Sequence, residues 1–286
     1  MTVMYDDHNP YSIVGEQPKL RASVVAFVDI LGYKALISES HQNGSAPSLL
    51  IRLHEALSAA SRRLNNLDED GNSFLPPNLW YKKDLYKIRT FTDNIVIGYP
   101  ILDDAEIEMG AVFSHLSLFQ LEMVNRGFFV RGAIAIGNVY IDDMIVFGQG
   151  FLDAYDGESK HARDPRIILA KSAQEAVKQH VNCYSNPSHS PQTRDLYKDS
   201  DGQFFLNYLE SILIAEEEYG PYFDILAKHK SVVEAKLIEY RDKPAYWAKY
   251  AWSASYHNFF CDQYRYFSVE HKIDVSQFKM QPTRIV

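Results

Sequence analysis

Residues 23–36 read SVVAFVDILGYKAL, and this stretch decides how the fold is interpreted. The apolar run from Ser23 to Asp29 is rich in Val and Phe, and Leu31-Gly32-Tyr33 follows it. A short continuous apolar run that is bounded by a turn is typical of a buried strand. We therefore predict a central strand that ends in an aspartate.

Hydrophobic periodicity predicts further elements on both sides of this strand. The expected helices span 47–67, 103–125 and 150–163. The expected strands are 86–91 and 95–99 around Thr92-Asp93-Asn94, 128–136 and 139–147 joined at Gly137-Asn138, and 166–169. Residues 65–78 are expected to form a solvated insertion. This order favours an α+β fold in which helices cover one face of a mostly antiparallel sheet.

The composition of the chain changes after Asn182. A loop with Pro187 and Pro191 follows, and residues 204–267 have helical composition and many aromatic side chains. We interpret these aromatic residues as packing rather than as a ligand site. The expected organisation is a domain over 1–182 and a helical C-terminal extension over 183–286 that packs on it.

The composition also limits the partners of the protein. The 286 residues are 46% apolar and 23% charged, which is ordinary for a globular chain. A net charge of −8 argues against general nucleic-acid binding, and the apolar runs are shorter than the ~18 residues of a membrane span. Cys183 and Cys261 form no disulfide framework, and the acidic start of the chain does not resemble a signal peptide, which favours the cytoplasm.

Two aspartates are candidates for metal binding. Asp29 ends the predicted central strand, and Asp93 lies at the tip of the predicted hairpin, so a folded sheet can bring the two carboxylates together. Mg²⁺ and Mn²⁺ prefer such oxygen ligands and keep positions open for phosphate. The structural alternative is that Asp29 caps a turn and Asp93 is only a hairpin residue.

Three motifs resemble those of the class III nucleotidyl cyclases, in the order of that family. Residues 27–36 resemble its first metal motif, residues 87–96 resemble its second, and residues 131–137 resemble the strand that follows its central helix. They occur within the region from Val24 to about Ala170, which is about half of the chain. The resemblance implies a ferredoxin-like antiparallel sheet and a homodimer, because class III sites form between two catalytic domains.

The resemblance also implies the chemistry of the site. Two divalent cations, Mn²⁺ or Mg²⁺, would be held by Asp29, Asp93 and the carbonyl of Ile30. The substrate would be a nucleoside triphosphate whose 3′-hydroxyl attacks the α-phosphorus, closes a 3′,5′-cyclic ring and releases pyrophosphate. The phosphates would lie against the turn formed by Gly32, Tyr33 and Lys34.

The residues that would read the base depart from the purine cyclases. Arg89 stands four residues before Asp93, where purine cyclases have Lys or Glu, and its guanidinium only donates hydrogen bonds. Ile145 stands three residues before Gly148, where adenylate cyclases carry Asp or Thr. These departures resemble the pyrimidine cyclases of the Pycsar antiphage defence systems. UTP is favoured over CTP because uracil presents two carbonyl groups, and a purine cyclase is the alternative.

The smaller Pycsar family resembles this chain at 154–167 and again at 249–258, so the likeness extends over most of the sequence. It implies that cyclic UMP or cyclic CMP acts as a second messenger in bacterial antiphage defence and activates a separate effector protein. Tyr155 and Glu158 lie on the helix that would face the substrate cleft, and the alternative is that they form an interface contact.

One departure affects the transition state. Purine cyclases carry an Asn and an Arg on the helix after Gly148, and the matching residues here are Leu152 and Asp156. A cation is still required where charge develops. Arg166 matches a family position that contacts the triphosphate, and other nearby candidates are Arg131, Arg163 and Lys160. The alternative is a catalytically silent, cyclase-like nucleotide-binding module.

Overall fold

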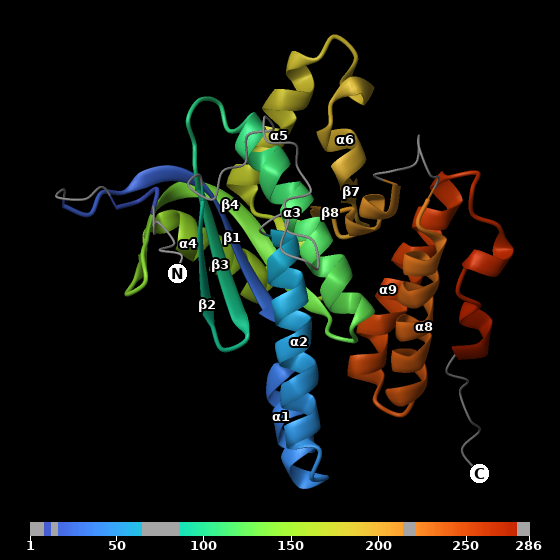
Figure 1. Cartoon of the computed structure of the whole chain (residues 1–286). Helices are drawn as coiled ribbons and strands as arrows, with labels where there is room; N and C mark the ends of the chain where they lie inside the picture. The colour runs from blue at the N-terminus through green and yellow to red at the C-terminus, as the bar shows by residue number, and fades with distance from the viewer. Residues whose placement is uncertain (1–8, 13–16, 65–85, 214–220, 279–286) are drawn as a thin grey trace, which may run out of the picture.

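The computed structural model describes residues 9–12, 17–64, 86–213 and 221–278. The expected insertion at 65–78 lies outside these residues. An eight-stranded sheet occupies the centre of the molecule (Figure 1), with strand order β2-β3-β1-β4-β6-β8-β7 and β5 paired to β4. The strands are β1 (Arg21–Ile30), β2 (Lys87–Phe91), β3 (Asn94–Pro100), β4 (Val130–Ile141), β5 (Val146–Phe147), β6 (Ile167–Leu169), β7 (Leu196–Lys198) and β8 (Phe204–Leu206).

All pairings in this sheet are antiparallel except that of β4 with β6. The expected mixed fold with a mostly antiparallel sheet is therefore confirmed. The helices are α1 (Tyr33–Gln42), α2 (Ala46–Leu64), α3 (Glu106–Asn125), α4 (Gln149–His161), α5 (Lys171–Cys183), α6 (Gln192–Asp195), α8 (Phe223–Glu239) and α9 (Pro244–Gln263), together with the 3₁₀ helix η3 (Tyr208–Leu213).

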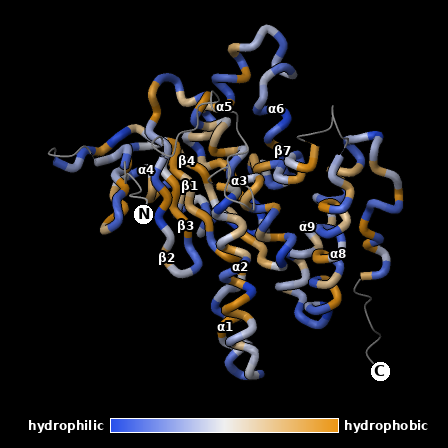
Figure 2. The backbone as a smooth tube through the Cα atoms, in the orientation of Figure 1, coloured by the Kyte–Doolittle hydropathy of each residue, from blue (hydrophilic) through white to orange (hydrophobic). Residues whose placement is uncertain are grey.

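Strand β1 is buried on both faces of the sheet. Val24, Ala26 and Val28 pack in the core that includes α2 and α3. Val25 and Phe27 pack in a second cluster with α4. The central strands of the sheet are coloured mostly as hydrophobic in Figure 2. The expectation that helices cover one face only is wrong, because a strand that is apolar at every position needs cover on both sides.

The expected break at Gly137-Asn138 is also wrong, because β4 continues through it to Ile141. A β-carbon at Gly137 would lie 2.8 Å from the Cα of Gly150 in α4. The glycine therefore serves the close contact of strand and helix rather than a turn. The turn comes later, where the amide of Asp142 donates to the carbonyl of Ile145 over 3.0 Å.

The C-terminal part of the chain is not entirely helical. Strands β7 and β8 extend the sheet beyond β6, where Phe205 pairs with Ile168. Helices α8 and α9 then pack beside each other at the side of the molecule (Figure 1). Tyr250, Tyr256 and Phe260 of α9 are buried, as expected for aromatic residues that serve packing.

Two buried histidines join α8 to α9. The rings of His229 and His257 stack with centroids 5.1 Å apart, and their Nδ1 atoms are 3.0 Å apart. His257 Nε2 lies 2.9 Å from the carbonyl of His271, and the Tyr208 hydroxyl lies 2.8 Å from His229 Nε2. With both imidazoles neutral, one arrangement of protons satisfies all three contacts. The Tyr208 hydroxyl donates to His229 Nε2, His229 Nδ1 donates to His257 Nδ1, and His257 Nε2 donates to the His271 carbonyl. Burial lowers the pKa of His257 to about 4 and lowers that of His229 as well.

We expect the stabilisation contributed by His257 to be lost on acidification. The unfolded chain binds a proton at this residue below about pH 6.5, whereas the folded protein binds it only near the lowered pKa of about 4. Between about pH 7 and about pH 4.5 this contribution falls by about 2.5 kcal/mol. Urea unfolding of the wild type and of His257→Gln at both pH values measures the difference. The exposed-site control His161→Gln should follow the wild type, and equal pH dependence of wild type and His257→Gln would contradict the prediction.

Candidate functional site

Strand β1 and the β2–β3 hairpin place Asp29 beside Asp93. Asp29 pairs with Asn94 across the sheet, and the amide of Ile30 donates to the backbone carbonyl of Asp93 over 3.2 Å. The hairpin turn is Thr92-Asp93, in which Thr92 has a φ of 50°, uncommon for a β-branched residue. The Thr92 hydroxyl donates to the Asp93 carboxylate over 2.6 Å. The sheet thus brings together the two aspartates that the sequence singled out.

The surroundings of Asp29 hold an excess of negative charge. Burial raises the pKa of Asp29 to about 6, and the neighbouring Asp93 carboxylate, which is hydrogen-bonded to it, adds to this rise. Arg131 opposes the rise through its positive charge. A pair of carboxyl groups at one partly buried place favours the binding of a cation or a proton.

Arg131 of β4 lies between two carboxylates. It pairs with Asp29 across the sheet, and its Nε and Nη2 atoms are both 3.3 Å from Asp29 Oδ2. Its Nε is also 2.7 Å from the carboxylate of Glu158 on α4, a residue that is only 4% exposed. Burial raises the pKa of Glu158. The negative charge at this site therefore comes from three elements, namely β1, the hairpin and α4.

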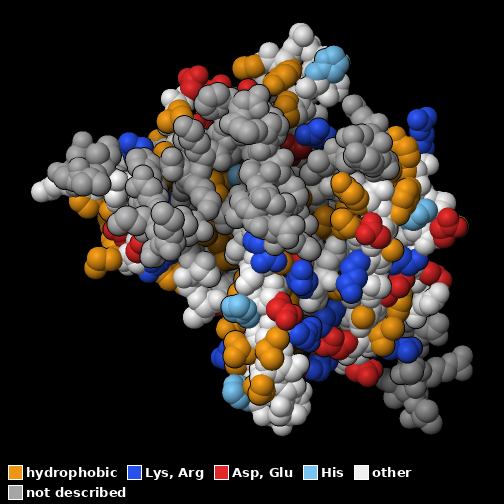
Figure 3. Space-filling model, viewed as in Figure 1, with side chains coloured by type: hydrophobic (Ala, Val, Ile, Leu, Met, Phe, Trp, Pro, Cys, Tyr) orange, Lys and Arg blue, Asp and Glu red, His pale blue; other side chains and the backbone are white. Residues whose placement is uncertain are grey.

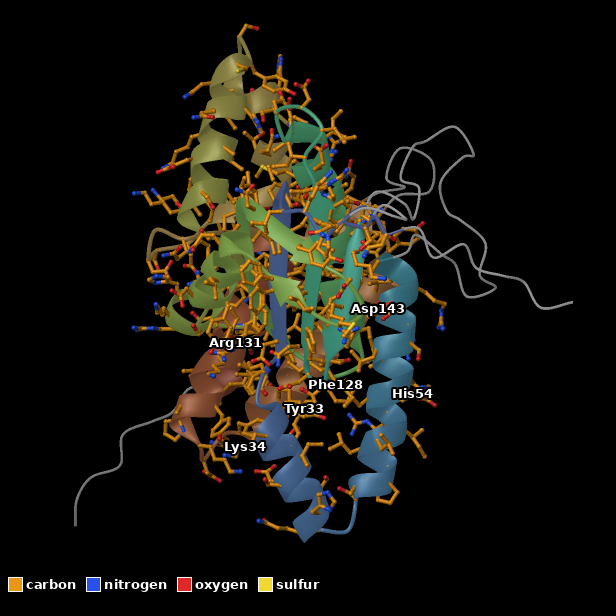
Figure 4. All side chains as sticks on the ribbon, turned by 90° about the vertical axis from the view of Figure 1, so that its left-hand side faces the viewer. Tyr33, Lys34, His54, Phe128, Arg131 and Asp143 are labelled. Carbon is orange, nitrogen blue, oxygen red and sulfur yellow. The ribbon has the colours of Figure 1, made fainter. Side chains whose placement is uncertain are left out.

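Helix α1 begins directly after Asp29 and Ile30. Gly32 has a φ of 75° and precedes the helix, and no side chain caps the first turn. The backbone amides of a first turn are free to bind an anion. Lys34 is exposed and Tyr33 is half-buried, and both lie at the same end of the sheet as Arg131 (Figure 4). The predicted phosphate-contacting residues therefore lie close to the carboxylate pair in the chain and in space.

Arg89 is held on β2, on the same face of the sheet as Asp29. Its side chain is 27% exposed, its guanidinium lies over the Phe91 ring at 5.2 Å, and Asp143 is 3.9 Å away. Within the described residues the buried Nε atom of Arg89 has no hydrogen-bond partner. The accessible part of this guanidinium, rather than the buried Nε atom, is what a ligand could contact.

An exposed apolar patch lies beside Arg89 and α4. Its members are between 45% and 86% exposed, namely Met144, Ile145, Phe147, Leu152 and Tyr155. Tyr155 also contacts the sheet, because its ring lies 5.4 Å from that of the buried Phe27. Contiguous exposed apolar residues of this kind mark an interaction surface.

Arg166 is not part of the group around Asp29. Its side chain is 1% exposed, and it forms ion pairs with Asp199 and Asp201. Its guanidinium also lies 5.6 Å from the ring of Trp252 on α9. In the described structure Arg166 therefore links β6 to the β7–β8 loop and to α9, and its expected contact with a triphosphate stays a prediction.

Lys249 of α9 is a charged residue near the site to which the sequence motifs gave no role. It is half-buried, and its charge interacts with those of Arg131, Asp164 and Asp29. Its only signal in the sequence was its place in residues 249–258, which were expected to resemble the Pycsar cyclases.

The residues present fit a divalent cation of the magnesium type. Asp29 and Asp93 offer carboxylate oxygens, and the Ile30 carbonyl follows directly in the chain. Hard cations prefer such oxygen ligands, and a bound positive charge would offset the burial and the Asp93 charge that raise the pKa of Asp29. Among the described residues, no three His, Cys, Asp or Glu side chains form a group that could hold a metal ion. A metal here would therefore rest on the aspartate pair, the carbonyl and the substrate.

A cavity of about 900 Å³ lies elsewhere, between α1, α2, α3 and α8. Lys and Arg side chains gather over this hollow in Figure 3. Its basic lining residues are Arg52, Arg126, Lys228 and Lys236, and its acidic ones are Glu39, Glu55, Glu122 and Glu239. The four basic side chains are matched by four acidic ones. The lining of this hollow therefore gives no preference for an anionic or a cationic ligand.

Comparison of the chain with protein-family models and with curated proteins finds no match. Within the described residues, no helix has the length and apolar character needed to cross a bilayer. The grouping of Asp29, Asp93, Arg131 and the start of α1 is the feature of the molecule from which a function can be argued.

Proposed function

We propose that this protein is a nucleotidyl cyclase that converts a pyrimidine nucleoside triphosphate to its 3′,5′-cyclic monophosphate and pyrophosphate. The observation that carries the proposal is the meeting of Asp29 and Asp93 at the end of one sheet, directly before the uncapped start of α1. The motifs that resemble class III cyclases lie on β1, on the β2–β3 hairpin and on β4, which are neighbours in the sheet.

The site offers the groups that such a cyclisation needs. Asp29, Asp93 and the Ile30 carbonyl would hold divalent cations, which would neutralise the triphosphate and make the 3′-hydroxyl more acidic. The amides at the start of α1, with Lys34 and Arg131, would bind and orient the phosphates. The 3′-oxygen then forms a bond to the α-phosphorus as the bond to the β-phosphate breaks, and the hydroxyl proton is lost.

Arg89 supports a pyrimidine as the base. Its partly exposed guanidinium carries donors only, which suits the carbonyl oxygens of uracil or the O2 and N3 acceptors of cytosine. Ile145 offers no side-chain acceptor for the amino group of adenine. We favour UTP over CTP because uracil carries two carbonyls.

The exposed patch on β5 and α4 supports a second copy of the chain as partner. It includes Phe147, Leu152 and Tyr155, and helix α4, which carries the last two, packs on the sheet face that carries Asp29 and Arg89. A homodimer would cover this surface and would form two sites. By the Pycsar resemblance, the cyclic nucleotide would act in the cytoplasm on a separate effector protein during antiphage defence.

A second candidate function is a silent nucleotide-binding module. The family resemblance assigned Arg166 to the triphosphate, but this arginine forms ion pairs with Asp199 and Asp201 instead. This observation favours the silent module. Leu152 and Asp156 also stand where purine cyclases carry their transition-state Asn and Arg. The retained aspartate pair is the argument for catalysis.

The direct test is incubation of the purified protein with Mn²⁺ and each of the four nucleoside triphosphates, followed by separation of the products. Cyclic UMP is expected as the main product and cyclic CMP as the second. Purine products alone would overturn the pyrimidine assignment. No cyclic product from any of the four would favour the silent module.

Arg89 is expected to set the preference between bases. Arg89→Glu replaces donors with acceptors, so the ratio of kcat/KM for UTP to that for GTP should fall at least about tenfold. Arg89→Lys keeps the positive charge, so in this variant the same ratio should fall less. The control Arg241→Glu makes the same charge change at an exposed arginine and should leave the ratio unchanged. An unchanged ratio in Arg89→Glu would remove Arg89 from base recognition.

A further inference from the structure

Lys249 is a half-buried lysine whose ammonium group forms no ion pair with any described residue. A partly exposed charge without an ion-pair partner contributes little to the stability of the fold. Its nearest charges include Arg131, which repels it, and Asp164 and Asp29, which attract it. Lys249 therefore lies beside the carboxylate site without being neutralised there.

Helix α9 is fixed on both sides of Lys249. The Tyr250 ring lies 4.9 Å from that of Phe129, directly before β4. The Trp252 indole donates to the Asp199 carboxylate over 2.7 Å. These contacts hold the backbone of Lys249 in place, while its long side chain keeps freedom to follow a ligand.

The same packing seats α9 against the end of the sheet that carries the site. Leu31, Phe129 and Tyr250 belong to one buried cluster. The amide of Leu31 donates to the carbonyl of Phe129 over 2.8 Å, just before α1 begins. The helix that carries Lys249 is therefore joined to the segment that links Asp29 to α1.

We propose that Lys249 binds the polyphosphate chain of the substrate, so that α9 completes the active site. The inference rests on the proposed function and assigns that site a cation from the C-terminal helices. Lys249 and Arg131 repel each other, and an anion between them would relieve this repulsion. A polyphosphate suits the pair because it carries several charges that a flexible ammonium and a planar guanidinium can share.

The test measures binding of inorganic tripolyphosphate to the full chain by calorimetry, in the presence of saturating Mg²⁺. Lys249→Gln should weaken this binding at least about tenfold, because a charge-assisted hydrogen bond is lost. Lys249→Arg keeps the charge, so its affinity for tripolyphosphate should stay within about threefold of that of the wild type. Lys171→Gln removes a fully exposed lysine on α5 and should have no effect.

Folding of the variants is measured by urea unfolding, and Lys249→Gln should unfold at the same urea concentration as the wild type, because its half-buried charge has no ion-pair partner. Equal tripolyphosphate binding by Lys249→Gln and the wild type would overturn the inference, as would an absence of binding by the wild type.

Product formation from UTP by the wild type is measured in parallel. If the wild type forms cyclic UMP and Lys249→Gln binds normally, only the Lys249 inference fails. If binding depends on Lys249 and no cyclic product forms, the inference stands as an anion site and the cyclase proposal fails.

Discussion

The Asp93→Asn variant is expected to form cyclic nucleotide at least about a hundredfold more slowly than the wild type at saturating UTP and Mn²⁺. Loss of a group that only orients a metal ligand costs about 10- to 100-fold in metal affinity or activity, so loss of a ligand carboxylate should cost at least the upper end of that range. The fold should persist, because Asp93 lies in a partly exposed turn and the change removes a repulsive neighbour of Asp29.

Two further measurements separate metal binding from folding. Mn²⁺ binding followed by electron paramagnetic resonance should weaken in Asp93→Asn, and the urea unfolding curve should match that of the wild type. Asp103→Asn, which makes the same change at an exposed aspartate ahead of α3, should affect neither measurement. Wild-type turnover by Asp93→Asn would remove the aspartate pair from the mechanism and favour a structural role for Asp93 in the hairpin.

The aspartate pair could be predicted from the sequence because local patterns mark each member. Asp29 ends an apolar run, and Asp93 lies between two short β-rich runs. Pairing of β1 with β3 then places both at one end of the sheet. The prediction needed only the period of the strands and the position of one turn.

The sequence placed Glu158 on a helix expected to face the cleft, but its contact with Arg131 and the approach of Lys249 depend on tertiary packing, which leaves no local pattern. Glu158 approaches Arg131 only because α4 sits close against β4, where Gly137 meets Gly150. Lys249 approaches through the contact of Tyr250 with Phe129. A sequence pattern reports that such helices exist but not where they pack.

The same limit explains the errors in the fold. Gly137-Asn138 has the composition of a hairpin turn, yet the glycine is required by the close approach of α4. Strands β7 and β8 contain three residues each, which is too short for a period of two to appear. Their place in the sheet depends on pairing with β6 and on the ion pairs of Arg166.

The Arg166→Met variant is expected to unfold with a free energy about 3 kcal/mol lower than that of the wild type. Removing one partner of a buried ion pair typically costs about 3–5 kcal/mol, and the lower end applies because Asp199 and Asp201 keep access to water. The variant also loses the contact of the guanidinium with the Trp252 ring. Urea unfolding at neutral pH measures the change.

The stability and the KM of Arg166→Met together show whether Arg166 acts through the fold or through the substrate, and Asp201→Asn is the control for loss of an exposed partner. Asp201 is 47% exposed at its side chain, so its loss should cost at most about 1 kcal/mol. If Arg166 anchors the β7–β8 loop and α9, Arg166→Met lowers stability, whereas its KM for UTP changes little in the folded fraction. If Arg166 instead releases its aspartates to bind the triphosphate, Arg166→Met raises the KM at least about tenfold with unfolding within about 0.5 kcal/mol of the wild type. That second outcome would contradict the anchoring role and return Arg166 to the place that the sequence resemblance gave it.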